Sequence, residues 1–147
     1  MYKIVDIARY FISKNNKYTD KQIQKLVYYA YCWYIVKNNT SENEINKKLF
    51  NERPEAWIHG PAFKSLYNEM KYNRKKFDKN DNYLKLDDDI KSLLDLIYNV
   101  YGDKSGNKLE LLSHNEAPWK EARKGLNPDE HSNERLEDRL IYEYYSN

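Results

Sequence analysis

Residues 19–37 read TDKQIQKLVYYAYCWYIVK and predict the longest helix of the chain. Thr19 is a typical N-cap residue, and Gln22 three positions later completes a capping box, in which two backbone N–H groups gain side-chain acceptors. The apolar positions that recur at helical spacing are Ile23, Leu26, Val27, Ala30, Tyr31, Tyr34 and Ile35, and Tyr28, Cys32 and Trp33 broaden the stripe. A stripe of this width must be covered on several sides, so we expect this helix at the centre of a bundle.

Further helices are expected on either side of this one. Apolar residues at helical spacing predict a helix over about residues 4–13, and those of residues 42–51 favour a short helical turn. Toward the C-terminus four more helices are expected. The first is capped by Asp87 and ended by Gly102, and the second covers about residues 107–114 and is capped by Ser105. The third covers residues 118–124, starts at Pro118 and is ended by Gly125, and the last is capped by Ser132.

Two short stretches favour extended structure. Residues 55–59, EAWIH, are too short for a helix and rich in β-favouring residues, and residues 83–86, YLKL, are a second candidate strand that can pair with them. Gly60 is expected to end the first strand and Pro61 to start a helix, because Pro at the first helical position lacks only an N–H that is unpaired there anyway. The expected fold class is mainly α, a compact helical bundle around residues 19–37 with one or two short strands.

Composition fits one folded domain over residues 1–147. Hydrophobic residues make up 40% of the chain and charged residues 33%, and there is no internal repeat or low-complexity linker. Tyr occurs 15 times and Phe only 4 times. Because the hydroxyl of a tyrosine needs water or a partner, many of these rings are expected between core and solvent. Either an AT-rich coding sequence or an interaction surface accounts for this usage.

Charge and cysteine usage limit the function classes. The 25 basic and 23 acidic residues give a net charge of +2, so no overall field draws the chain to nucleic acid or to a membrane. The single cysteine, Cys32, excludes an internal disulfide and is expected to be buried and inert. With no signal-peptide pattern and no apolar run long enough for a bilayer, a cytoplasmic protein is expected.

Residues for catalysis or metal binding are not grouped in the sequence. His59, His114 and His131 fall in separate segments without the spacing of metal ligands, and there is no glycine-rich phosphate loop. The acidic run 87–89 is explained by a helix N-terminus, where negative charge is favourable. A catalytic pair of His114 with Glu116 is a weaker alternative to a histidine stabilised at a helix C-terminus. We therefore expect no cofactor, no metal and no enzymatic activity.

The segment 55–61, EAWIHGP, has two interpretations. In the structural one, Trp57 fills the core, His59 bonds a backbone group, Gly60 permits a close approach and Pro61 fixes the helix start. In the functional one, the turn belongs to a surface that docks a partner, with Trp57 and His59 in contact.

The segment 71–79 is basic and carries interleaved aromatic residues. A solvated helix end, a surface for an acidic protein partner and a site for single-stranded nucleic acid are the three interpretations, the last disfavoured by the near-neutral chain. The candidate partner-binding residues in this segment are Tyr72, Arg74, Lys75 and Lys76.

Three segments together resemble a known family, the Panacea domain, also called SocA-like or GepA-like. They are residues 24–30, QKLVYYA, with Trp33 beyond; residues 55–61 with the pattern Trp57-x-x-Gly60-Pro61; and residues 114–123 with Pro118-Trp119. We take Trp33, Trp57, Gly60, Pro61, Pro118 and Trp119 as the structural motif.

The resemblance implies a mostly helical, phage-associated antitoxin. Such a protein neutralises a toxin encoded beside it, by masking the toxin or by delivering it to an ATP-dependent protease, so its partners would be the cognate toxin and that protease. The alternative is a phage-encoded protein that inhibits a host or competing factor and has no cognate toxin. A hydrolase or nucleic-acid enzyme is the weakest hypothesis.

Overall fold

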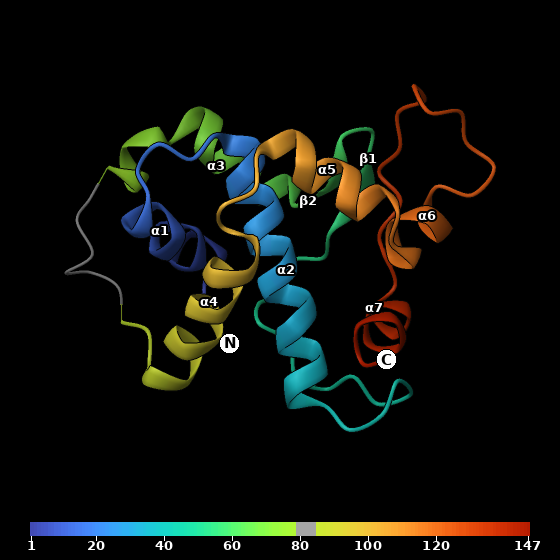
Figure 1. Ribbon diagram of the computed structural model, residues 1–147, viewed down its shortest axis with the longest axis horizontal. Coiled ribbons are helices and arrows are strands. Elements are labelled where there is room, and N and C mark those ends of the chain that lie inside the picture. The colour runs from blue at the N-terminus through green and yellow to red at the C-terminus, as the bar shows by residue number, and fades with distance from the viewer. Residues whose placement is uncertain (79–84) are drawn as a thin grey trace.

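The computed structural model describes residues 1–78 and 85–147. Its elements, in chain order, are α1 (Ile4–Lys14), α2 (Asp20–Asn38), β1 (Glu55–Trp57), β2 (Gly60–Ala62), α3 (Lys64–Tyr72), the 3-10 helix η1 (Arg74–Phe77), α4 (Asp88–Tyr101), α5 (Gly106–His114), α6 (Ala117–Ala122) and α7 (Asp138–Tyr145). The mainly helical fold expected from the sequence is therefore confirmed (Figure 1).

Helix α2 runs through the middle of the molecule, with α1 and α4 on one side, α7 on the other and α5 across its N-terminal half (Figure 1). The predicted capping box is present: the Thr19 side chain accepts from the Gln22 N–H, and Gln22 accepts from the Thr19 N–H. All ten residues of the run 23–32 are buried. A helix buried on every side is what the wide apolar stripe predicted.

The expected helical turn over residues 42–51 is wrong. The side chain of Asn39 accepts hydrogen bonds from the backbone N–H groups of Asn46 and Lys47 and donates to the Lys47 carbonyl. These backbone groups are thereby satisfied without helical pairing. The loop still contributes Leu49 and Phe50 to the core.

The last helix begins later than predicted. Ser132 does not cap it but accepts from the Glu134 N–H in a local turn. Residues 134–136 then run extended along β1, because the Ala56 N–H donates to the Glu134 carbonyl and the Leu136 N–H to the Pro54 carbonyl. Helix α7 starts only at Asp138, once this pairing has ended.

The partner of β1 also differs from the prediction. It is β2, and Pro61 lies in that strand instead of starting a helix. Ala56 of β1 lies opposite Pro61 of β2. The N–H and C=O groups of Ala56 both form hydrogen bonds with groups outside the hairpin, so Ala56 and Pro61 form no hydrogen bond with each other. The missing N–H of proline therefore costs no hydrogen bond at this position. In the second predicted strand, residues 83–84 lie outside the described residues, and Lys85 and Leu86 are not in a strand.

Several tyrosines are buried more deeply than expected, although Tyr2, Tyr34, Tyr98 and Tyr142 lie between core and solvent as predicted. Tyr28, Tyr29 and Tyr31 are fully buried in the core. Their hydroxyls find partners inside the protein, as Tyr29 donates to Glu116 and Tyr31 to Asp138. A buried phenol whose hydroxyl is paired adds ring packing without an unsatisfied polar group, so the core accepts tyrosines where phenylalanines would be usual.

Candidate functional site

The β1–β2 hairpin lies against the N-terminal half of α2. Ile58 and His59 form its turn, and Gly60 follows with a φ of 107°, a conformation that residues with a side chain rarely adopt. A Cβ atom on Gly60 would lie 2.7 Å from Cε of Lys25 and 3.0 Å from Oγ of Ser113. The expected close approach at Gly60 is thus present, and the neighbour is the side chain of Lys25.

Two polar side chains of α2 hold the hairpin in place. Gln24 bonds both backbone groups of Phe63, accepting from its N–H at 2.9 Å and donating to its carbonyl at 3.0 Å. Lys25 donates to the Pro61 carbonyl at 3.0 Å. Both side chains are buried, so these bonds form where an unpaired polar group would be costly.

Helix α6 and its flanks hold the other side of the hairpin. The Trp119 indole N–H donates to the Trp57 carbonyl at 2.9 Å, and the Arg123 guanidinium to the Ala56 carbonyl at 2.9 Å. The ring of His114 stacks on that of Trp119, with centroids 3.9 Å apart. The hairpin is therefore fixed from two directions by side chains that come from distant parts of the sequence.

A groove of about 800 Å³ opens beside the hairpin, and we call it the signature groove. It is lined by residues of the hairpin turn, of α2, of α3 and of the 131–133 loop: Asp20, Lys21, Gln24, Lys25, Trp57, Ile58, His59, Gly60, Ala62, Tyr67, Met70, Lys71, His131, Ser132 and Asn133. A concave, largely apolar site with a few convergent polar groups is the usual form of a binding site.

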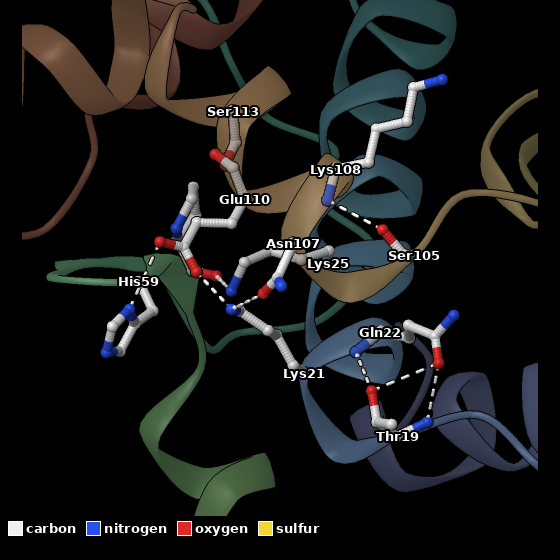
Figure 2. A network of polar contacts seen from close by, with 11 residues as sticks. Thr19, Lys21, Gln22, Lys25, His59, Ser105, Asn107, Lys108, Glu110 and Ser113 are labelled. Carbon is white, nitrogen blue, oxygen red and sulfur yellow. Dashed lines mark hydrogen bonds and ion pairs between the residues drawn. The ribbon is translucent and has the colours of Figure 1, made fainter.

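Charged groups converge at one end of the signature groove. Lys21 forms an ion pair with Glu110, and Nδ1 of His59 lies 3.3 Å from the same carboxylate (Figure 2). Burial acts to raise the pKa of Glu110, but the bonds from Lys21 and His59 outweigh it and lower the pKa. Burial lowers the pKa of Lys25 to about 7. The positive charge of Lys21 lowers this pKa further, and the negative charge of Glu110 acts to raise it. A buried amine with so low a pKa is typical of functional sites.

Aromatic rings and a lysine form the outer rim. The ring of Trp57 packs edge-on against that of Tyr67, with centroids 5.4 Å apart. The Lys71 ammonium lies 5.7 Å from the centre of the Tyr67 ring and 5.3 Å from that of Tyr72. Tyr72 is 70% exposed and Tyr67 43%, so this rim presents aromatic surface and positive charge to solvent. The expectation that Trp57 fills the core is wrong, since its ring is half-buried at this groove.

The predicted basic residues lie beside this rim. Tyr72 ends α3, and Arg74, Lys75 and Lys76 are exposed in η1. Arg74 pairs with Asp20 of α2, and Lys76 pairs with Glu69 of α3. Two of the three predicted basic contacts are thus already engaged within the protein.

The other residues singled out from the sequence are Trp33, Pro118, His59 and His114, and each contacts other parts of the protein. Trp33 lies in the C-terminal half of α2, where its indole donates to the Tyr101 hydroxyl. Pro118 lies in the first turn of α6, as predicted, and its side chain is buried. His59 bonds Glu110 instead of a backbone group, and its side chain is 73% exposed. His114 is the last residue of α5, the helix-end position expected for it, and burial lowers its pKa.

The residues that sequence reasoning missed are Gln24, Lys25 and Glu110. In the sequence, Gln24 and Lys25 stand out only as part of the family pattern. A signal was nevertheless present, since both interrupt the most apolar segment of a helix expected to be buried on all sides. A charged residue in such a place must have a partner, and that argument points to Lys25.

The described part of the chain holds no group of three or more His, Cys, Asp or Glu side chains arranged to bind a metal ion. No helix within residues 1–78 or 85–147 is long and apolar enough to cross a membrane.

Comparison with family models matches residues 23–120 to "Antitoxin SocA-like, Panacea domain". This range contains most of α2, the hairpin, α3 and most of α6, and these elements build or anchor most of the signature groove. No match was found among curated proteins or among solved structures. Because the match covers most of the chain, the protein belongs to the family of antitoxin SocA-like Panacea domains.

Proposed function

We propose that this protein is a non-enzymatic antitoxin that binds and neutralises a cognate protein toxin. The observation that carries the proposal is membership of an antitoxin-like family. Neutralisation occurs either by masking the toxin or by presenting it to an ATP-dependent protease.

We propose the rim of the signature groove as the contact surface. Interfaces are enriched in tyrosine and tryptophan, and here Trp57, Tyr67 and Tyr72 lie together around Lys71. The exposed cations Lys71 and Lys75 complement an acidic patch on the toxin. The hairpin side of the rim is fixed by buried hydrogen bonds, so little ordering would be needed on binding.

The first experiment is co-expression with the product of the adjacent reading frame. We expect growth to be restored and the two proteins to copurify. Growth rescue without a complex would contradict direct binding, and failure to bind any product of the same operon would favour an inhibitor of a host or competing factor.

Surface variants then test the contact residues. Reversing Arg74 or Lys76 would place an acid beside Asp20 or Glu69, so the cleaner changes are Lys71→Glu, Lys75→Glu and Tyr72→Ala at exposed positions. The matched control is Lys47→Glu, which changes another exposed lysine, in the loop that follows the C-terminal end of α2 (Figure 1).

We expect the rim variants to weaken toxin binding with an unchanged melting temperature, and Lys47→Glu to bind like the parent protein. Equal binding by all four variants would show that this rim is not part of the interface. The antitoxin proposal itself would still be tested by the co-expression experiment.

A further inference from the structure

A second pocket, of about 580 Å³, lies beside the C-terminal half of α2 and is lined by no residue of the hairpin. Its walls include Trp33 of α2, Tyr101 of α4, Glu116 before α6, and Glu143, Tyr144 and Tyr145 of α7. Four aromatic residues and two carboxylates thus meet in one concave site, which we call the aromatic–acidic pocket.

Glu116 is the residue that gives this pocket its chemistry. It is only 8% exposed, and its Oε1 accepts hydrogen bonds from the hydroxyls of Tyr29 at 2.8 Å and Tyr145 at 2.7 Å. No lysine, arginine or histidine of the described residues forms an ion pair with it. Burial raises the pKa of Glu116, against the effect of the two phenols. A carboxylate held in place and almost buried without a counter-ion favours a positively charged ligand.

The aromatic residues complete a site for an organic cation. The rings of Trp33 and Tyr145 have centroids 5.6 Å apart, and those of Tyr144 and Tyr145 4.9 Å apart. The Trp33 indole donates to the Tyr101 hydroxyl at 3.1 Å, and the Tyr101 ring is stacked on Tyr29. Rings fixed in this way offer their π-electrons to a cation, as in the aromatic cages that bind ammonium groups.

We propose that the aromatic–acidic pocket binds one alkylammonium or guanidinium group, with Glu116 as its counter-ion and Trp33, Tyr101, Tyr144 and Tyr145 around its apolar part. The cation is either a lysine or arginine side chain of a partner protein or a free amine. Glu143 at the rim adds negative charge, although it also pairs with Arg139 at 3.6 Å. The site shares no lining residue with the signature groove, so the inference does not depend on the toxin contacts proposed at that groove.

The test is an NMR titration of the full-length protein that follows the tryptophan indole N–H signals. The three signals are assigned with single Trp→Phe variants, and the signals of Trp57 and Trp119 serve as internal controls. The probes are Nα-acetyl-lysine amide, Nα-acetyl-arginine amide, cadaverine as a free amine, and Nα-acetyl-norleucine amide as the neutral match of the lysine probe. We expect cationic probes to shift the Trp33 signal and the norleucine probe to leave it in place.

Variants of the parent protein decide which groups bind. Glu116→Gln keeps an acceptor for both phenols but removes the charge, and Tyr144→Ala removes a ring that is 39% exposed and so tests the cage without emptying the core. We expect each to weaken binding by about tenfold or more. Glu42→Gln, in the loop after α2, is the matched control and should bind like the parent protein.

Each outcome bears on the proposal. Binding of the blocked amino acids alone identifies a partner side chain as the ligand, and binding of cadaverine alone identifies a free amine. A Trp33 signal that no cation moves, equal shifts by the norleucine probe, or unchanged binding in both Glu116→Gln and Tyr144→Ala would overturn it.

Discussion

Lys25 shows how one buried charge can hold a site together. Its stem fills the space that Gly60 leaves open, and its ammonium bonds the Pro61 carbonyl. Removal from water destabilises the charged form, and Lys21 nearby adds repulsion. The hairpin is thus anchored by a buried amine whose pKa lies well below that of an exposed lysine.

Stability should therefore depend on pH through Lys25. The folded pKa of about 7 lies below the unfolded value of 10.5, so between these values the unfolded chain binds more protons and the free energy of unfolding rises with pH. We expect the free energy of unfolding of the parent protein, relative to Lys25→Met, to rise by up to about 1.4 kcal/mol per pH unit between about pH 7 and 9.5. Urea unfolding at several pH values measures this, and parallel curves for the two proteins would contradict it.

Gly60 should tolerate a side chain far less than Gly125 does. Both have positive φ, 107° and 86°, but a Cβ on Gly125 meets no atom within 4 Å, whereas one on Gly60 meets Lys25 and Ser113. Gly125→Ala should lower the free energy of unfolding by about 1 kcal/mol through backbone strain alone, and Gly60→Ala by about 3 kcal/mol because crowding is added. Chemical denaturation measures the free energy of unfolding of both variants. Equal losses would mean that the Lys25 side chain moves away from the new Cβ atom at no cost in free energy.

At the scale of elements, the hairpin depends on side chains from elsewhere for its stability. A two-stranded sheet is marginal by itself, and this one has only three residues in each strand. Arg123 is its most connected anchor, since it bonds the carbonyls of Ala56, Asn127 and Glu130. One side chain therefore joins β1 to the loop after α6.

Removing that anchor should open the hairpin locally. Arg123→Met leaves three carbonyls without their donor, and we expect a loss of about 3 kcal/mol. Hydrogen exchange of residues 55–62 should speed up, while that of α1 stays unchanged. Arg139→Met is the matched control, because Arg139 is half-exposed and its ion pairs are long, so it should cost less than about 0.5 kcal/mol. If residues 55–62 of Arg123→Met exchanged at the parent rate, the hydrogen bonds of Gln24, Lys25 and Trp119 would be sufficient to hold the hairpin closed.

Local sequence signals predicted the helices well where caps and periodicity coincide. Thr19, Asp87 and Ser105 each cap the helix that was expected to follow. Prediction failed where distant groups decide the conformation. Residues 42–51 bond Asn39, residues 134–136 pair with β1, and Pro61 is accepted in a strand only because Ala56 bonds Glu134 and Arg123. No local pattern encodes these contacts.

The candidate site was predicted only in part for the same reason. The segments around Trp57 and Tyr72 were singled out, and the structure places both at the signature groove or its rim. Their connection to Lys25 and Glu110 depends on how α2 and α5 pack, which spacing along the chain does not reveal.

At the scale of the whole molecule, α2 links two sites of different character. Its N-terminal half supports the signature groove with Gln24 and Lys25, and its C-terminal half supplies Trp33 to the aromatic–acidic pocket. Between them α2 is buried by α1, α4 and α7. Both sites are thus built on the best-packed element, which favours surfaces that need little rearrangement to bind.

Of the two proposed modes of action, we predict that the protein masks its toxin and does not need a protease. We expect the purified protein to inhibit its purified toxin in equimolar mixtures with no protease present, because a rim that is already formed can cover the toxin directly. The Lys71→Glu, Lys75→Glu variant should need a higher concentration for the same inhibition, and Lys47→Glu should not. Toxin activity measured in the purified mixture tests this, and toxin abundance in cells with and without ATP-dependent proteases tests the alternative. A toxin that remains active in the mixture but disappears from cells in a protease-dependent manner would show that the protein acts as an adaptor.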